Sequence, residues 1–173
     1  MDKVAICTAF GTWTLLDQYK HLHAKGKFPG YSLKLHVGTI GSLIKRTGSE
    51  SLLDYGCGKG WQYSEMELHH AWGIMPSLYD PAVPGLHRKP VGRFDGVICT
   101  DVMEHIPERN IPATLDEIFG YAEKFVFLSI CTRPSKKTLP DGRNCHLTVR
   151  PHEWWLDKIG DRGILTEIAW HDD

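Results

Sequence analysis

An α/β fold with a mostly parallel β-sheet is predicted by three features of this 173-residue sequence. Short apolar runs alternate with amphipathic helical segments, three of the runs end at an aspartate, and glycines follow the first of them at every second position. Strands that alternate with helices form right-handed βαβ units, which build a parallel sheet. Ligands of such sheets bind beyond the carboxyl ends of the strands, so residues that follow a strand are the first candidates for function.

Two helices are expected before the sheet begins. The first has apolar residues at near-helical spacing from Trp13 to Leu22 and ends around Gly26. The second has Ser32 as its cap and ends near Gly48. Its apolar face consists of Leu33, Val37, Ile40 and Ile44.

The sheet and its crossover helices follow. Strands are expected at residues 51–53, 77–80, 94–100, 125–130 and 163–170. Helices are expected at residues 60–70, 111–122 and 151–159. Asn110 is expected to cap the second of these helices, with Pro112 in its first turn, and Pro151 opens the third.

The segment Asp54-Tyr-Gly56-Cys-Gly58-Lys-Gly60 follows the first strand. Its glycines permit positive φ angles and close approach of the backbone to a ligand. A dinucleotide-binding loop needs glycines at the first, third and sixth positions, and the sixth position from Gly56 is Trp61. The spacing therefore disfavours a nicotinamide cofactor, and an ordinary glycine turn remains the alternative to a cofactor loop.

Aspartate followed by alternate glycines resembles the first motif of the class I S-adenosylmethionine-dependent methyltransferases. Two further segments lie where that family has them. Residues 77–80 form a short strand that ends in Asp80, and residues 94–105 form a strand that leads into Asp101-x-x-Glu104-His105. The resemblance covers roughly residues 50–170, and it implies a three-layer αβα, Rossmann-like methyltransferase fold.

The resemblance implies that the cofactor is S-adenosylmethionine. Asp80 is then expected to accept hydrogen bonds from the two ribose hydroxyls, because an ionised carboxylate offers only acceptors and matches a vicinal diol. Asp101 is expected to contact the methionine portion, and the start of the helix after the glycines to take the methionine carboxylate. The predicted cofactor-binding residues are Asp54, Tyr55, Gly56, Cys57, Gly58, Gly60, Tyr79, Asp80, Asp101 and Val102.

His105 and His146 are the predicted catalytic residues. His105 follows the strand that ends near Asp101, and an oxygen acceptor benefits from a general base, which histidine provides at neutral pH. The alternative for Glu104-His105 is a structural role in orienting its loop. His146 belongs to a polar cluster, residues 144–155, between a strand and the next helix, where loops carry function.

Tyr31, Arg150 and Trp154 are the predicted contacts of the methyl acceptor. Arg150 suits a carboxylate or phosphate, which its guanidinium binds through two hydrogen bonds. The alternative for the cluster at residues 144–155 is a structural role, in which its residues cap a helix and its tryptophans pack in the core. By analogy with the family, Tyr31 and Phe28 are candidate lid residues, and packing at a helix corner is their alternative role.

Two departures from the family pattern are visible. Residues 81–94 leave no room for the usual helix, third strand and second helix, and Pro81, Pro84 and Pro90 disfavour a helix there. We therefore expect that edge of the sheet to be abbreviated. The sequence also lacks the family's antiparallel last strand, which residues 3–10 could replace.

The composition disfavours several classes of protein. A net charge of −1 argues against electrostatic binding of bulk nucleic acid, and we interpret Lys136, Lys137 and Arg143 as a solvated loop. The five cysteines show no paired spacing, which indicates free thiols in a reducing compartment. With no membrane-length apolar stretch and no signal-peptide pattern, we expect a cytoplasmic protein. No metal site is expected, because adjacent His69 and His70 cannot face one ion and the other histidines lack ligand spacing.

These observations predict one domain over residues 1–173, with a helical lid or cap at 1–48 and an α/β core at 49–173. The expected function is transfer of a methyl group from S-adenosylmethionine to O, N or C of a small-molecule acceptor, without a membrane partner. The alternatives are a non-catalytic module that binds S-adenosylmethionine and an enzyme that cleaves it. The sequence indicates neither the acceptor nor the oligomeric state.

Overall fold

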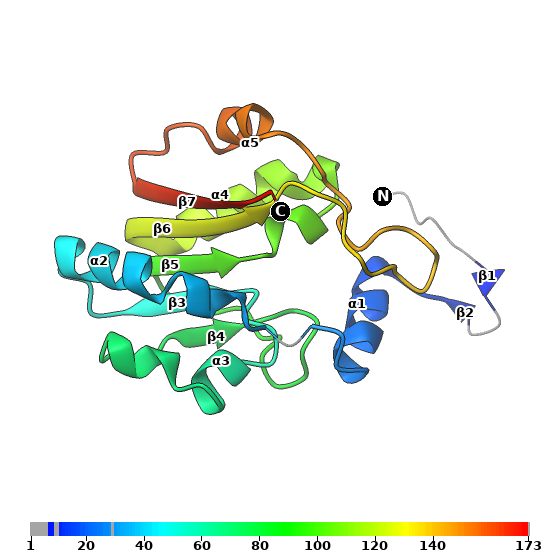
Figure 1. The fold of residues 1–173 in the computed structure, drawn as a ribbon, viewed down its shortest axis with the longest axis horizontal. Helices are drawn as coiled ribbons and strands as arrows, with labels where there is room; N and C mark the ends of the chain where they lie inside the picture. The colour runs from blue at the N-terminus through cyan, green and yellow to red at the C-terminus, as the bar shows by residue number, and fades with distance from the viewer. Residues whose placement is uncertain (1–6, 9–10, 29, 173) are drawn as a thin grey trace.

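The computed structural model describes residues 7–8, 11–28 and 30–172. Its centre is a five-stranded parallel sheet in the order β4-β3-β5-β6-β7 (Figure 1). The strands are β3 (Leu52–Tyr55), β4 (Ser77–Tyr79), β5 (Phe94–Thr100), β6 (Ala122–Cys131) and β7 (Leu165–His171). This topology confirms the predicted α/β fold.

Helices cover both faces of the sheet and complete three layers (Figure 1). They are α1 (Leu15–Ala24), α2 (Val37–Thr47), α3 (Trp61–Ser64), α4 (Ile111–Tyr121) and α5 (His152–Ile159). A buried cluster that includes Ile40 and Tyr63 joins α2 and α3 to one face, and a second cluster with Leu115 and Trp155 joins α4 and α5 to the other. In the described part of the chain, no helix is both long enough and apolar enough to cross a membrane.

The central strands are buried on both faces. In β5, Val97 and Cys99 belong to the cluster under α4 and α5, whereas Ile98 between them belongs to the cluster under α2. This alternation follows from the two-residue period of a strand. Because both faces are covered, these strands are continuous apolar runs in the sequence. The buried thiols that the structure describes are free, as predicted: Cys57, Cys99, Cys131 and Cys145.

Helix ends follow local sequence signals. Thr14 and Asp17 form a capping box at the start of α1, in which the Asp17 N–H donates to Thr14 Oγ1 and the Thr14 N–H donates to Asp17 Oδ2. α2 ends at Gly48, which has the left-handed conformation (φ 59°) typical of helix carboxyl ends. Asn110 precedes α4 as predicted, but its side chain makes no capping hydrogen bond.

Two helix predictions need correction. Ser32 does not cap α2, because residues Ser32–Leu35 form a separate 3₁₀ turn ahead of it. The helix predicted at residues 60–70 is interrupted: α3 ends at Ser64, and a 3₁₀ turn spans Leu68–Ala71. Glu67, immediately before that turn, has φ 51°, a conformation that cannot continue a right-handed helix.

The sheet edge beyond β4 is abbreviated, as predicted. The described residues between Asp80 and β5 form neither a helix nor a strand, and all pairings of the sheet that the structure describes are parallel. Cys7–Thr8 (β1) pairs with Gly11–Thr12 (β2) in a separate two-stranded sheet, so these residues do not replace the missing last strand. Residues 3–6 and 9–10 lie outside the described part of the chain.

Candidate active site

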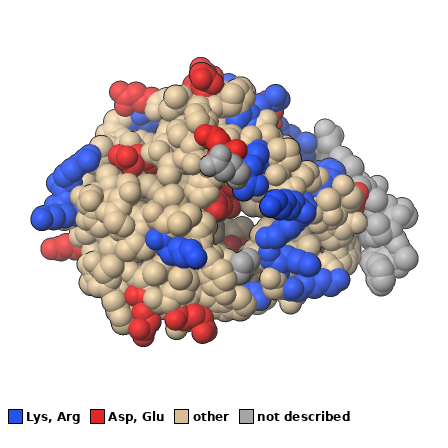
Figure 2. Space-filling model, viewed as in Figure 1, with Lys and Arg blue, Asp and Glu red and all other residues tan. Residues whose placement is uncertain are grey.

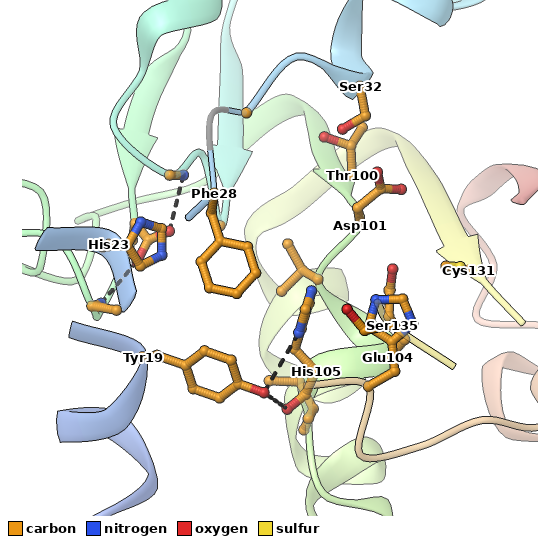
Figure 3. Close-up of a pocket in the computed structure, with 18 of the residues that line it drawn as sticks. Tyr19, His23, Phe28, Ser32, Thr100, Asp101, Glu104, His105, Cys131 and Ser135 are labelled. Atoms are coloured by element: carbon orange, nitrogen blue, oxygen red, sulfur yellow. Dashed lines mark hydrogen bonds between the residues drawn. The ribbon is translucent and has the colours of Figure 1, made fainter. Parts of the chain in front are cut away.

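A cavity of about 700 Å³ lies at the carboxyl end of the sheet. In Figure 1 the strand arrows point toward α1 and toward the loop that follows β6. The cavity is lined by the glycine loop after β3, the turn after β5, α1 and the loop after β6. Figure 3 shows Tyr19 pointing toward His105, with Glu104 beside His105 and Asp101 above them.

The glycine loop leaves β3 in a conformation that needs glycine. Gly56 has φ 83°, and a Cβ atom there would lie 2.4 Å from Cγ2 of Val102, which is too close for any side chain. The N–H groups of Gly56 and Cys57 donate to the carbonyl oxygen of Tyr79, over 2.7 and 3.1 Å. The loop is therefore held between the ends of β4 and β5, with its backbone against the cavity.

Asp80 joins the end of β4 to the glycine loop. Its Oδ2 atom accepts the N–H of Gly58 at 2.9 Å, and its Oδ1 atom accepts the N–H of Ala82 at 2.8 Å. The carboxylate is buried against the cavity and lines it. Each carboxylate oxygen has a second lone pair, so Asp80 keeps acceptor capacity for a ligand with two neighbouring hydroxyls.

Asp54 lies beneath the loop rather than in the cavity wall. It is fully buried, and its Oδ2 atom accepts the hydroxyl of Tyr63 at 2.7 Å and the side-chain amide of Gln62 at 3.1 Å. Burial raises the pKa of Asp54 from its ordinary value to about 6, against the opposing effect of these hydrogen bonds. Asp54 therefore braces the start of α3 under the glycine loop.

Asp101 belongs to a polar network at the ends of β5, β6 and β7. It has the left-handed conformation (φ 54°), which is rare outside glycine and is often found at functional sites. The hydroxyl of Ser129 donates to its Oδ1 atom at 2.6 Å, and Nε2 of His171 lies 3.2 Å from that hydroxyl oxygen. Nε2 of His36 lies 3.2 Å from Nε2 of His171. These contacts fix the Asp101 side chain at the cavity wall.

His105 is held by the carbonyl group of Cys145 and the phenol of Tyr19. Its Nδ1 atom lies 2.9 Å from the carbonyl oxygen of Cys145, and since a carbonyl only accepts, Nδ1 carries the proton and Nε2 the lone pair. The Tyr19 hydroxyl lies within donor distance of the carbonyl oxygens of Cys145 (2.8 Å) and His105 (3.1 Å). Burial, and then the neighbouring His146, lower the pKa of His105 to about 4, so the ring is uncharged at neutral pH.

Glu104 is the residue before His105 and is completely buried. Neither of its carboxylate oxygens has a hydrogen-bond partner among the described residues. Burial, and then Asp101, raise the pKa of Glu104 well above its ordinary value. Its carbonyl oxygen accepts the N–H groups of Leu147 and Thr148 at 2.7 and 3.0 Å, which ties the turn after β5 to the segment that carries His146.

Basic side chains line one side of the cavity. Figure 2 shows a hollow on this face with Lys and Arg side chains gathered to its right. Arg133, Lys136 and Lys137 line the cavity, and Nζ of Lys137 lies 4.6 Å from the ring centre of Phe28. The interpretation of this segment as a solvated loop is therefore wrong for Lys137, which is half-buried, whereas Lys136 is exposed as that interpretation expects. It holds for Arg143, which pairs with Asp141 at 2.7 Å.

Most of the predicted site residues meet in this cavity. Those that line it are Tyr31, Tyr55, Gly56, Cys57, Gly58, Asp80, Asp101, Val102, His105 and His146. Asp54, Gly60 and Tyr79 do not line it but support the glycine loop from below or beside it. Phe28, the other candidate lid residue, lines the cavity with its ring 5.4 Å from that of His105.

Arg150 and Trp154 lie away from this cavity. Arg150 forms an ion pair with Glu108. The Oε2 atom of Glu108 accepts hydrogen bonds from Nη2 and Nε of Arg150 at 2.6 and 2.9 Å. The Trp154 ring packs edge-on against Trp155 beside the α4 and α5 cluster. Their assignment to the acceptor stays a prediction that this geometry does not support.

Several cavity residues were not predicted from the sequence. Tyr19 and His23 line it from α1, where residues four apart share one face. The sequence signal that could have identified them is the presence of a tyrosine and a histidine on an otherwise apolar face of the helix. Arg133 and His171 come from a loop and from the last strand, and nothing in their local sequence marks them.

Comparison with known proteins agrees with the geometry. A family model described as a methyltransferase domain matches residues 36–162, a span that includes the glycine loop, Asp80, the turn with Glu104 and His105, and His146. No curated protein and no solved structure matches the chain. α1, with Tyr19 and His23, precedes the matched span. On the matched span and the five-stranded parallel sheet, the chain belongs to the class I methyltransferase family.

Proposed function

We propose that this protein is an S-adenosylmethionine-dependent methyltransferase that acts on a small-molecule acceptor. One observation carries the proposal. The Asp80 carboxylate and the glycine loop are joined by a hydrogen bond and line the same cavity as the Asp101 turn and two histidines. This arrangement supports a cofactor pocket and a reaction site that share one space at the carboxyl end of the sheet.

The residues present suit the cofactor. Asp80 has free lone pairs for the ribose hydroxyls, while its backbone hydrogen bonds hold it in place. Gly58, with φ 59°, lets the backbone approach a ligand without a side chain in the way. Asp101 supplies a carboxylate for the amino group of the methionine portion.

When bound, the cofactor supplies a methyl carbon activated by its positively charged sulfur. The acceptor's lone pair forms the new bond to that carbon while the carbon–sulfur bond breaks and leaves its electron pair on sulfur. An acceptor that carries a proton releases it to a base or to water. The chain's main task is to align the two reactants, an effect that can contribute up to about 7–11 kcal/mol.

The cavity chemistry favours an acceptor with negative charge. Arg133, Lys136 and Lys137 line the side of the cavity formed by the loop after β6. The Nε atom of Arg133 is buried without a hydrogen-bond partner among the described residues. A carboxylate or phosphate on the acceptor would match these cations and give Arg133 its partner.

Calorimetric titration with S-adenosylmethionine and S-adenosylhomocysteine tests the cofactor assignment. We expect saturable binding of both, weakened at least about tenfold by Asp80→Ala, since hydrogen bonds to a charged group contribute about 1.5–3 kcal/mol. Asp157→Ala, on the outer side of α5, is the control and should bind as the wild type does. Absence of binding to either compound by the folded wild-type chain would refute the proposal.

A second assay separates the alternative functions. Incubation with methyl-labelled cofactor and a panel of small anionic hydroxyl and amine compounds should yield labelled acceptor and S-adenosylhomocysteine. Release of methylthioadenosine instead would identify an enzyme that cleaves the cofactor. Tight binding with no product from any acceptor would favour the non-catalytic module.

A further inference from the structure

Glu104, His105 and His146 bring three potential metal ligands together at the cavity. One carboxylate oxygen and one ring nitrogen from each histidine all lie within 4.8 Å of one another. Glu104 and His105 come from the 3₁₀ turn Met103–His105 after β5, and His146 comes from the loop that precedes α5. All three residues line the cavity, and Figure 3 shows Glu104 beside His105.

Both histidines have the tautomer that metal-bound histidines usually have. Nδ1 of His105 donates to the carbonyl oxygen of Cys145 at 2.9 Å, and Nδ1 of His146 donates to that of Arg133 at 2.6 Å. These bonds fix the tautomer, so that each Nε2 atom carries an available lone pair. A backbone carbonyl on the other ring nitrogen is the common second partner of a metal-bound histidine.

The carboxyl group of Glu104 is the third candidate ligand. It is completely buried, and neither oxygen accepts a hydrogen bond from the described residues. A buried acidic group without a partner is costly, and such groups are normally paired or bound to a metal. The two hydrogen bonds to its own carbonyl oxygen, from Leu147 and Thr148, keep the Glu104 turn next to the His146 segment.

We propose that Glu104, His105 and His146 bind a divalent first-row transition-metal ion, with the remaining coordination positions open to the cavity. Two imidazoles and one carboxylate are a donor set that suits Zn²⁺, Fe²⁺, Co²⁺ or Mn²⁺, whereas Mg²⁺ and Ca²⁺ prefer oxygen ligands. Three protein ligands also leave the open position that catalytic metal sites keep. No metal site was expected from the sequence, because the histidines lack a ligand spacing. The fold instead brings ligands that are distant in the sequence close together.

The distances require only a small closing of the site. Ligand atoms around a zinc ion lie about 2.0–2.2 Å from the metal, and therefore roughly 3–3.5 Å from one another. Contraction from separations of up to 4.8 Å needs side-chain movements on the order of 1 Å.

The metal site also has a role in the proposed methyl transfer, and this role rests on the proposed function. A metal at this position binds an acceptor hydroxyl in its open coordination position and lowers the pKa of that hydroxyl. The acceptor then loses its proton to water, and the resulting oxygen attacks the methyl carbon while the electrons of the carbon–sulfur bond remain on sulfur. The inference therefore narrows the acceptor atom from O, N or C to oxygen.

Metal binding is measured on the whole chain without the cofactor. The chain is stripped with EDTA, transferred to chelator-free buffer and titrated with Co²⁺, whose visible absorption reports nitrogen and oxygen ligands. Zn²⁺ is measured by competition, and Mg²⁺ in parallel. We expect one equivalent of Co²⁺ or Zn²⁺ per chain and no saturation by Mg²⁺ at the same concentrations.

Two variants locate the site, and one controls for surface histidines. Glu104→Gln and His146→Gln should each weaken Co²⁺ binding at least about tenfold, since even residues that only orient metal ligands change affinity by about 10–100-fold. His70→Gln, which removes an exposed histidine, should bind as the wild type does. Circular dichroism establishes that each variant is folded, and either variant alone is enough to locate the site.

Two results would overturn the proposal. One is the absence of stoichiometric Co²⁺ and Zn²⁺ binding by the folded wild-type chain. The other is equal binding by the wild type and by a folded Glu104→Gln or His146→Gln variant. Titration of the same samples with S-adenosylhomocysteine keeps the two proposals separate. A wild-type chain that binds this ligand but no metal rejects only the metal site, and a wild-type chain that does not bind the ligand rejects only the proposed function.

Discussion

The Oδ2 atom of Asp80 accepts the backbone N–H of Gly58 across 2.9 Å. This bond connects the end of β4 to the middle of the glycine loop, two segments that meet only because β3 and β4 are neighbours in the sheet. Asp80 therefore shapes the loop as well as offering acceptors to a ligand. Changes at Asp80 should affect both the stability of the empty protein and its affinity for the cofactor.

Asp80→Asn tests the contribution of these hydrogen bonds to stability, because it changes the acceptors of the side chain but hardly its shape. An amide has one acceptor oxygen, so it cannot accept from both Gly58 and Ala82 as the carboxylate does. We expect the free energy of unfolding to fall by about 1–3 kcal/mol, in line with the loss of a hydrogen bond to a buried charged group. Urea denaturation measures this. Asp157→Asn is the surface control, and equal stability of Asp80→Asn and wild type would contradict the prediction.

Gly56→Ala should destabilise the protein more than Gly85→Ala, in which the added methyl group contacts no other residue. A methyl group at Gly56 would lie 2.4 Å from Cγ2 of Val102, whereas at Gly85, with a similar φ of 89°, nothing lies within 4 Å. Gly85→Ala should therefore cost only the left-handed strain, about 1–2 kcal/mol. Gly56→Ala should cost that amount plus the steric clash, measured by urea denaturation.

A double variant identifies the cause. Addition of Val102→Ala to Gly56→Ala removes the clashing atoms and should restore part of the lost stability. If both glycine variants have the same stability, the contact with Val102 does not constrain the loop.

Asp54→Asn should remove one component of the pH dependence of stability. The folded pKa of about 6 lies above the ordinary value of 3.8, so ionisation of Asp54 is harder in the folded chain. Its contribution is therefore most favourable at low pH and is lost as the pH rises from about 4 to about 6. The stability of Asp54→Asn relative to wild type should rise by about 3 kcal/mol over this window. Urea denaturation at a series of pH values measures the difference, and a difference independent of pH would contradict it.

Tyr19→Phe should loosen the contact between α1 and the two histidine segments. The Tyr19 hydroxyl is placed to donate to the carbonyl oxygens of Cys145 and His105. Its loss should lower the free energy of unfolding by about 1 kcal/mol, the usual contribution of such a bond. Tyr31→Phe is the matched control, because Tyr31 is exposed and its hydroxyl makes no hydrogen bond to the described residues. Thermal denaturation of both variants tests the prediction, which fails if their midpoints coincide.

Local signals in the sequence accounted for most of the fold. The apolar runs predicted all five strands of the sheet, and the three prolines after Asp80 predicted its abbreviated edge. Helix ends were predicted where a specific cap exists, as at Gly48. The prediction failed at residues 60–70, where the left-handed Glu67 interrupts the helix, because no glycine or proline in the sequence marks that break.

The sequence by itself determined the parallel α/β sheet, the glycine loop and the aspartates at the strand ends, because strand period, turn chemistry and cap residues act between near neighbours. Only the tertiary structure decided which distant side chains share the cavity. It brought His146 to Glu104 and His105, placed Tyr19 against the same turn, and drew Arg150 away toward Glu108. These contacts join segments far apart in the chain, and they depend on packing and hydrogen bonds that no local pattern encodes.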